Sequence, residues 1–191
     1  QQDFPALADL TAQTVQCDIQ DVDAGLEAYS SPAFYMIPPI DALMQNTIRI
    51  NRSSTADGIE LYTTLAHEGY PGHLYQTVYS SLVCDTQTLP IRKLFSYGGY
   101  VEGWAYYTER ISYEYAAQVL AEAEGSLGSS YPAALLCTLL AQQRDLQINL
   151  FCLLDLSLHY YGAEESELLR SLESFGLSEE QSERVYDYLR T

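Results

Sequence analysis

The stretch HEGYPGH, residues 67–73, decides how the rest of this sequence is interpreted. Its two histidines stand six positions apart, which on a regular α-helix separates the side chains of His67 and His73 by about 120°. Pro71 breaks that regularity, because it cannot donate to the His67 carbonyl and its ring clashes there. The flanking Gly69 and Gly72 tolerate unusual backbone angles. We therefore expect the helix to be interrupted at Pro71, so that His67 and His73 meet.

Two histidines that meet beside a glutamate are typical of a catalytic zinc site, in which the glutamate faces the attacking water. Glu68 stands directly after His67, as the base does in the helical HExxH arrangement. A single histidine is more often a core or surface residue. The combination of Glu68, Pro71 and two glycines favours a metal site here, with Glu68 as the general base.

The sequence predicts helices on both sides of this stretch. Residues 53–57 offer several side chains that can cap orphan N–H groups, so a helix should run from about residue 57 into the motif. Gly98-Gly99 marks a break or a helix start. Further helical segments are expected at 74–83, 91–124, 133–161, 163–175 and 178–189. The segment 133–161 is apolar on several sides, so we expect it to be central.

Residues 1–56 are expected to be irregular, with at least one strand. Prolines at positions 5, 32, 38 and 39 interrupt any long helix. Residues 47–51 alternate polar and apolar side chains, as a half-buried strand does. This strand could belong to a hairpin or form an edge, and an edge could align a peptide by backbone pairing or simply be capped. The expected fold is therefore mainly α, with a small β element near the N-terminus.

Length sets the expected organisation of the chain. Its 191 residues suffice for one domain, interpreted as a strand-containing lead-in at 1–56 and a helical part at 57–191. The first residues carry neither an initiator Met nor a signal peptide. We expect a processed chain or a piece of a longer polypeptide.

The charge of the chain excludes several classes of partner. Its formal charge is −17, from 26 acidic and nine basic residues, which argues against binding to nucleic acids or anionic membranes. The acidity can serve solubility alone, or it can attract cations, including a metal. Arg144 and Asp145 lie near the middle of the apolar segment 133–161 and argue against its insertion into a membrane.

A second motif adds a family resemblance. HEGYPGH followed by EGWA at 102–105 resembles the bacterial family known as domain of unknown function 885. The pattern Asp155-x-x-x-His159-x-x-Gly162 and Arg144 are similar to further positions of that family. Its members resemble zinc-dependent peptidases of the gluzincin type, and their chains are longer. The resemblance, over residues 30–190, implies a zincin-like helical catalytic domain, here its C-terminal part.

By position, the resemblance implies that His67, His73 and Glu102 bind Zn²⁺ and that Glu68 is the general base. Two histidines and one carboxylate leave one coordination position open, as in catalytic zinc sites. Glu109 is the rival ligand, because it follows Glu102 by seven residues and faces nearly the same way on a helix.

Four other residues are candidates for the reaction. Asp155 and His159 stand at i and i+4 and share a helix face. In the functional interpretation Asp155 and Arg144 either support the metal ligands from outside or bind substrate, with Asp155 able to orient a ligand histidine, and His159 donates to the transition-state oxyanion. The structural interpretation is a buried polar group of the same three residues. Tyr106, one turn after Glu102, is a further candidate for catalysis.

The expected activity is that of a metallopeptidase, which cleaves peptide bonds with a metal-activated water. The alternatives are a metal-dependent amidase acting on non-peptide or cell-wall amides, and a non-catalytic domain that keeps a structural metal. The expected partners are a peptide substrate and the remainder of a longer polypeptide. The resemblance favours an extracytoplasmic location or a lipoprotein.

Overall fold

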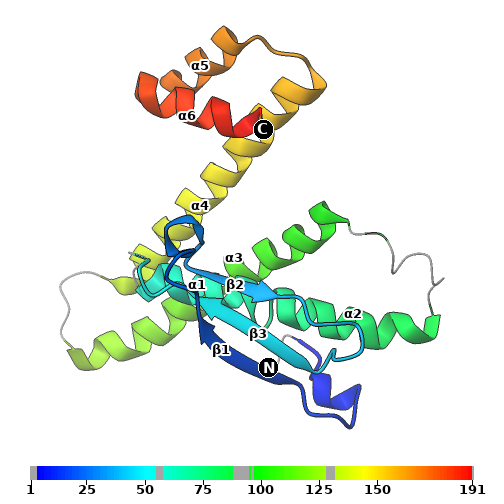
Figure 1. Ribbon diagram of the computed structural model, residues 1–191. Helices are drawn as coiled ribbons and strands as arrows, with labels where there is room; N and C mark the ends of the chain where they lie inside the picture. The colour runs from blue at the N-terminus through cyan, green and yellow to red at the C-terminus, as the bar shows by residue number, and fades with distance from the viewer. Residues whose placement is uncertain (1–3, 55–57, 88–94, 96, 128–131, 191) are drawn as a thin grey trace. The chain divides into compact units, whose positions relative to one another are not determined.

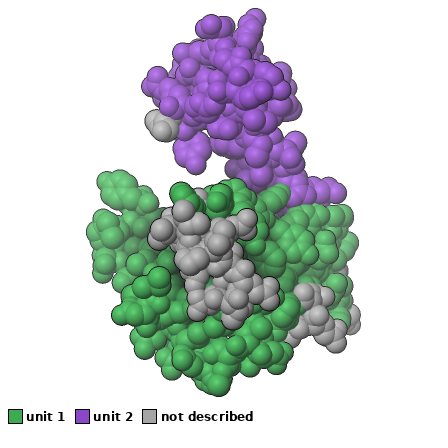
Figure 2. Space-filling model, turned by 90° about the vertical axis from the view of Figure 1, so that its right-hand side faces the viewer, with its two compact units in different colours: residues 1–138 green, residues 139–191 purple. Residues whose placement is uncertain are grey.

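The computed structural model describes residues 4–54, 58–87, 95, 97–127 and 132–190. The chain divides into two compact units, residues 1–138 and 139–191, which are treated separately below (Figure 2). The first unit contains a three-stranded sheet and helices α1 to α3, and the second contains most of α4 followed by a helical hairpin (Figure 1). The expected mainly α fold, with a small β element near the N-terminus, is confirmed.

The sheet consists of β1 (Gln16–Asp21), β2 (Ala33–Met36) and β3 (Gln45–Ile50). Their order is β1-β3-β2, with β3 parallel to β1 and antiparallel to β2. The predicted strand at 47–51 is therefore present as β3, and with β2 it forms a hairpin. It is the central strand, so the prediction that it could form an edge is wrong. The edge of the sheet next to the helices is β2, because α1 packs against it.

The hydrophobic core of the first unit lies between the sheet and the helices α1 (Gly58–Glu68), α2 (His73–Gln87) and α3 (Gly98–Leu127). Its buried residues are Leu7, Ala33, Ile48, Leu74, Tyr75 and Val78. The short 3-10 helix Leu7–Asp9 closes this core. The predicted starts near residue 57 and at Gly98, and the interruption around Pro71, are confirmed.

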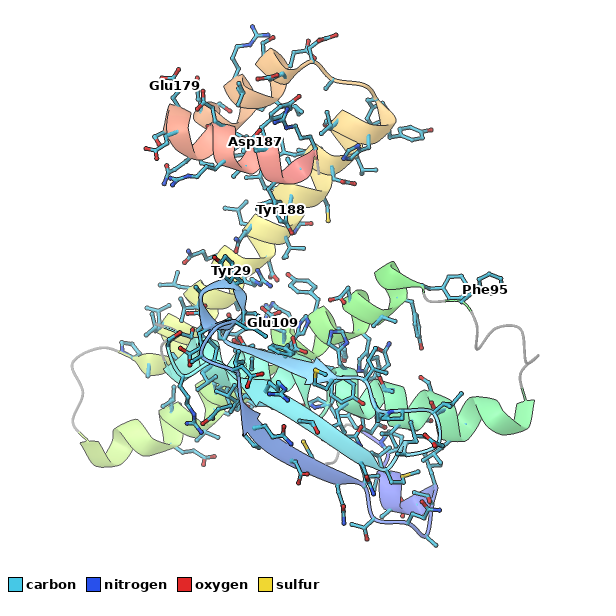
Figure 3. All side chains as sticks on the ribbon, in the orientation of Figure 1. Tyr29, Phe95, Glu109, Glu179, Asp187 and Tyr188 are labelled. Carbon is cyan, nitrogen blue, oxygen red and sulfur yellow. The ribbon has the colours of Figure 1, made fainter. Side chains whose placement is uncertain are left out.

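The second unit is held by a smaller core. Helix α4 (Ala133–Asp155) continues as the π-helical turn η4 (Leu156–Tyr160), and the hairpin of α5 (Glu165–Ser174) and α6 (Glu179–Leu189) follows. Leu154, Leu168 and Leu172 are buried where these helices pack. Figure 3 labels Glu179, Asp187 and Tyr188 along α6.

Two local signals explain how this hairpin is bounded. Ser178 starts α6 with a capping box, in which its side chain accepts from the Gln181 N–H and the Gln181 side chain accepts in return. Gly162 and Gly176 follow η4 and α5 with φ of 68° and 92°, a region that glycine enters without steric cost.

Two expectations about the long helices are corrected. Helix α3 runs to Leu127, so it passes the expected end at 124, and residues 128–131 of the predicted turn lie outside the described part. The segment 133–161 is not a central helix, since Leu139, Leu146 and Leu153 are 54%, 63% and 56% exposed. Within the described residues, no helix combines the length and the apolarity needed to cross a bilayer.

Candidate metal centre

The loop between α1 and α2 brings the two motif histidines together. The ring centroids of His67, at the end of α1, and His73, at the start of α2, lie 4.8 Å apart. The expected interruption at Pro71 therefore does bring these side chains together. The peptide bond between Tyr70 and Pro71 is cis.

The glycines of this loop are required for a different reason than expected. Positive φ angles occur at Gly162 and Gly176 and not at Gly69 or Gly72, so unusual backbone angles are not their role. A Cβ at Gly72 would collide with the carbonyl oxygens of His67 and Ala66. A Cβ at Gly69 would lie 2.8 Å from the Leu65 carbonyl oxygen. Glycine lets the loop fold closely back on the end of α1.

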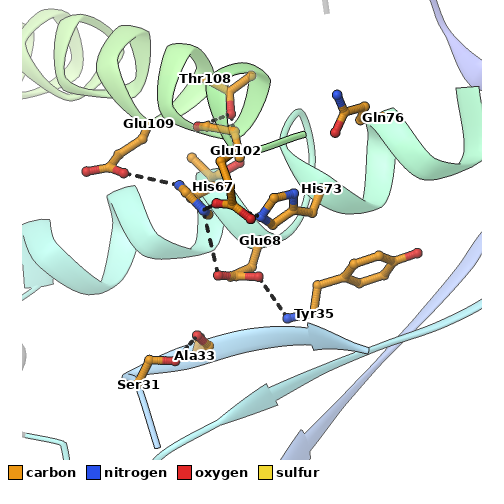
Figure 4. A network of polar contacts seen from close by, with 12 residues as sticks. Ser31, Ala33, Tyr35, His67, Glu68, His73, Gln76, Glu102, Thr108 and Glu109 are labelled. Carbon is orange, nitrogen blue, oxygen red and sulfur yellow. Dashed lines mark hydrogen bonds and ion pairs between the residues drawn. The ribbon is translucent and has the colours of Figure 1, made fainter. Parts of the chain in front are cut away.

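Glu102 reaches the two histidines from the N-terminal part of α3 (Figure 4). Its Oε2 lies 3.6 Å from His67 Nε2 and 3.7 Å from His73 Nε2. The imidazoles are mostly buried, with side chains 17% and 13% exposed, whereas Glu102 is 66% exposed. Three donor atoms from two separate parts of the chain thus surround one point that is open to solvent on the Glu102 side.

Glu68 lies on the sheet side of this cluster. Its Oε2 accepts a hydrogen bond of 2.9 Å from the backbone N–H of Tyr35 on β2 (Figure 4). Its other oxygen, Oε1, lies 4.0 Å from His67 Nε2. Glu68 is therefore held beside the donor atoms by the edge of the sheet, with one oxygen directed toward the cluster.

Glu109 occupies the opposite side of the His67 ring. Its Oε2 lies 3.1 Å from Nδ1 of His67, and its side chain is 8% exposed. When Nδ1 donates to this carboxylate, Nε2 is left as the lone-pair nitrogen that faces Glu102. Glu109 is thus placed to orient the His67 imidazole, on the opposite side of the ring from Glu102, and this contact favours Glu102 over Glu109 as the candidate ligand.

The electrostatic environments of the two histidines differ. Burial lowers the pKa of His67, but its hydrogen bond with Glu109 and the charges of Glu68, Glu109 and Glu102 outweigh burial and raise the pKa above the ordinary value. Burial and the positive charge of His67 lower the pKa of His73, although Glu68 and Glu102 oppose them. In the metal-free protein, a single proton therefore prefers His67 over His73.

The donor set fits a zinc ion. Zinc binds His nitrogen and carboxylate oxygen at about 2.0–2.1 Å, so ligand atoms at the corners of a tetrahedron lie about 3.3–3.4 Å apart. The separations of 3.6 and 3.7 Å from Glu102 to the two histidines are close to that value. His67, Glu68 and His73 also offer atoms within 4.8 Å of one another, which makes Glu68 a competing ligand. We favour Glu102, because its Oε2 lies nearer to His67 Nε2 than Glu68 Oε1 does and the other Glu68 oxygen is bonded to the Tyr35 N–H.

The other candidates lie elsewhere in the chain. Tyr106 is half-buried on α3, one turn after Glu102. Asp155, His159 and Arg144 belong to the second unit. His159 Nε2 lies 3.7 Å from Asp155 Oδ1 and 2.8 Å from the Leu189 carbonyl, and Arg144 bonds the Gln147 side chain. Asp155 and His159 are 59% and 53% exposed, so the interpretation as a buried polar group is wrong. The catalytic roles of all four remain predictions.

Two contributors to the site were not identified from the sequence. The Tyr35 N–H is a backbone group, and no side-chain pattern marks it. The other contributor is Trp104, whose indole N–H donates to the Pro71 carbonyl at 2.8 Å. A signal for Trp104 existed, since it stands two positions after Glu102 in the EGWA motif.

The sequence matches the family described as "Bacterial protein of unknown function (DUF885)" over residues 2–183. The chain belongs to this family. No curated protein matches it.

One solved structure has the same fold. It is described as "The crystal structure of the putative lipoprotein from Colwellia psychrerythraea", with a TM-score of 0.64 and 20% sequence identity. The likeness covers 96% of this chain and 30% of that one. The present chain therefore spans less than a third of the length of the protein it resembles.

Proposed function

We propose that this chain carries the zinc site of a hydrolase that cleaves peptide bonds, of the gluzincin type. The observation that carries the proposal is the meeting of His67 Nε2, His73 Nε2 and Glu102 Oε2 at separations close to a zinc coordination edge. Glu68 beside them supplies the base that a zinc hydrolase needs. Nitrogen and carboxylate donors in this mixture favour Zn²⁺ over Mg²⁺ or Ca²⁺, which prefer oxygen ligands alone.

Each residue has a defined part in the proposed reaction. His67, His73 and Glu102 would hold the ion, which when bound polarises a water molecule and the substrate carbonyl. Glu68 accepts the proton that the water loses as its oxygen bonds the carbonyl carbon. Glu68 then delivers that proton to the amide nitrogen as the C–N bond breaks, which yields a carboxylic acid and an amine. Tyr106, on the same helix as Glu102, is a further candidate for catalysis.

The edge of β2 supports a peptide as the substrate. β2 has one neighbouring strand, β3, and its outer edge carries the Tyr35 N–H that bonds Glu68. Beyond the Tyr35 N–H, which Glu68 occupies, an extended peptide could add to this edge through backbone hydrogen bonds. Its scissile bond would then run past Glu68. A small amide without an extended backbone makes less use of this edge, which is why we place the amidase second.

The test is the pair of variants Glu68→Gln and Glu114→Gln, assayed on a mixed library of internally quenched peptides in the presence of zinc. Glu68→Gln should keep its zinc and lose about 10²- to 10⁴-fold in kcat, the usual contribution of a general base. Glu114 is an exposed glutamate on α3 paired with Arg110, so its variant should match the wild type.

Two results would reject this function. Wild-type protein that holds zinc but cleaves no peptide would favour an amidase or a structural metal site. A Glu68→Gln variant that cleaves at the wild-type rate would remove Glu68 from the reaction. Elemental analysis of each sample separates loss of metal from loss of catalysis.

We further propose that the protein acts outside the cytoplasm as part of a longer polypeptide. The support is the likeness to a structure described as a lipoprotein, whose chain is more than three times as long. Recovery of native activity from a membrane or periplasmic fraction, and not from cytosol, is the corresponding measurement.

A further inference from the structure

The chain has one tryptophan, and it joins the two parts of the metal centre. Trp104 lies on α3, two positions after Glu102, and its indole N–H donates to the Pro71 carbonyl at 2.8 Å. Pro71 lies between His67 and His73. A single side chain therefore links the loop that carries the histidine pair to the helix that carries the carboxylate.

The indole is held on its faces and edges by other aromatic rings. It stacks on Tyr75 of α2, with centroids 6.1 Å apart and planes 16° apart. Phe4 meets it edge-on at 5.9 Å, and Tyr107 lies at 6.1 Å. Tyr75 is itself buried in the core of the first unit. This packing fixes the orientation of the indole, so that its only donor points at Pro71.

A second, weaker link lies one turn further along α3. The Thr108 hydroxyl is bonded to the Ala105 carbonyl at 2.8 Å and lies 3.4 Å from the Ala66 carbonyl at the end of α1. Thr108 and Trp104 thus contact the backbone on both sides of His67. Apolar packing tolerates small shifts along a helix axis, whereas a directed hydrogen bond does not.

We propose that Trp104 is a positioning residue for the metal centre, which sets the register of Glu102 on α3 against the His67–His73 loop. Glu102 is 66% exposed and has a flexible side chain, so its own contacts do little to place it. Its position depends on where the N-terminal part of α3 lies, and the indole bond to Pro71 determines that position. This inference rests on the proposed zinc site and assigns a function to the tryptophan of the EGWA motif.

The test compares Trp104→Phe with Tyr79→Leu. Phenylalanine keeps an aromatic ring and removes the N–H, while Tyr79→Leu removes a ring that stacks on the other partner, Tyr75, at 5.4 Å. Zinc affinity, measured by calorimetric titration, should fall about 10- to 100-fold in Trp104→Phe, the usual effect of losing a partner outside the ligand shell. Tyr79→Leu should lower the unfolding temperature and leave zinc affinity unchanged. Zinc should also change the fluorescence of Trp104 in the wild type.

A second measurement works without metal. In the metal-free protein, the NMR ring-proton signals of His67 and His73 should shift in Trp104→Phe and stay in place in Tyr79→Leu. The inference is overturned if Trp104→Phe leaves both zinc affinity and these signals unchanged. It is also overturned if Tyr79→Leu shifts both to the same extent, because general loss of packing would then explain the effect. Wild-type protein that takes up no zinc would reject the proposed function, and the ring signals would still decide the role of Trp104.

Discussion

Each of the two compact units contains a carboxylate–histidine pair, and the two pairs differ in the distance between their atoms and in the exposure of their side chains. In the first unit, Glu109 and His67 approach to 3.1 Å with side chains 8% and 17% exposed. In the second, Asp155 and His159 lie 3.7 Å apart with side chains 59% and 53% exposed. His159 is nearer to the Leu189 carbonyl at the end of α6, at 2.8 Å, than to Asp155.

The difference lies in how each pair is assembled. Asp155 and His159 are neighbours because they stand four residues apart in one helical stretch, so any helix with this spacing would produce the pair. Glu109 and His67 come from α3 and α1, and Glu102, His73 and the Tyr35 N–H converge on the same place. Residues from separate elements meet only when the whole unit is folded. Convergence of this kind is stronger evidence for a site than spacing within one helix.

Removal of one histidine from each unit should give the largest difference between the two units. His67→Ala should abolish zinc binding, with a loss of affinity above the roughly 100-fold effect of an outer partner, because a ligand is lost. His159→Ala should bind zinc like the wild type. Elemental analysis after dialysis against a weak chelator measures both. Equal loss of zinc in the two variants would mean that the second unit also supplies a ligand.

The next largest difference in zinc affinity is expected between variants of the two paired carboxylates, Glu109 and Asp155. Glu109→Gln should weaken zinc binding about 10- to 100-fold, because the Nδ1–H of His67 loses its charged partner. Asp155→Asn serves as the exposed counterpart and should leave zinc affinity unchanged. Competition with a fluorescent zinc indicator gives both constants. A Glu109→Gln variant with wild-type affinity would reduce Glu109 to a packing residue.

Glycine substitutions test the loop that brings the first set of residues together. Gly72→Ala should lower the free energy of unfolding by about 1–3 kcal/mol, because its Cβ would collide with the His67 and Ala66 carbonyls and shift the backbone. Gly103→Ala on α3 is the matched control, since no atom lies within 4 Å of its Cβ position, and it should stabilise by about 0.5–1 kcal/mol. Urea denaturation followed by circular dichroism compares them. A neutral Gly72→Ala would mean that the loop has another available path.

The smallest effect concerns pH in the metal-free protein. The raised pKa of His67 contributes stability that is full below the unfolded value of about 6.5 and is lost as pH rises through the folded pKa. The lowered pKa of His73 contributes stability above that value, which is lost as pH falls through its folded pKa. The two contributions act on opposite sides of about 6.5, so the stability of the metal-free protein should be greatest near that pH and fall modestly on either side. NMR titration of the ring protons should find His67 titrating at the higher pH, and the reverse order would contradict this account.

The helical part of the fold was predictable because its signals are local. Gly98 and the capping residues before α6 mark helix starts, and Gly162 and Gly176 mark helix ends where φ is positive. The sheet was only partly predictable. Cys17 and Ile19 of β1 alternate with polar residues, but all six residues of the strand are exposed, and its parallel pairing with β3 joins segments far apart in the chain. β1 is therefore stabilised by its pairing with β3, and local sequence signals do not predict that pairing.

The residues of the candidate site also divide into those that local sequence signals predict and those that they do not. The meeting of His67 and His73 followed from Pro71 and two glycines inside seven residues. The place of Glu102 came from a family resemblance, since no local rule sets how α3 lies against α1. The contribution of Tyr35 is a backbone N–H, which leaves no pattern in the sequence. The EGWA motif marks Trp104, but it does not show that the indole bonds the Pro71 carbonyl.

Three exposed leucines of α4 should make the protein prone to association in concentrated solution. Leu139, Leu146 and Leu153 are all more than half exposed and recur every seven residues, so they form an apolar row along one side of the helix. The net charge of −17 opposes association through this row by mutual repulsion. Salt weakens the repulsion, because the screening length falls from about 10 Å at 0.1 M to about 3 Å at 1 M, while it leaves the attraction between leucines intact. Buffers of low ionic strength should therefore keep the protein dispersed, and high salt should drive it into aggregates.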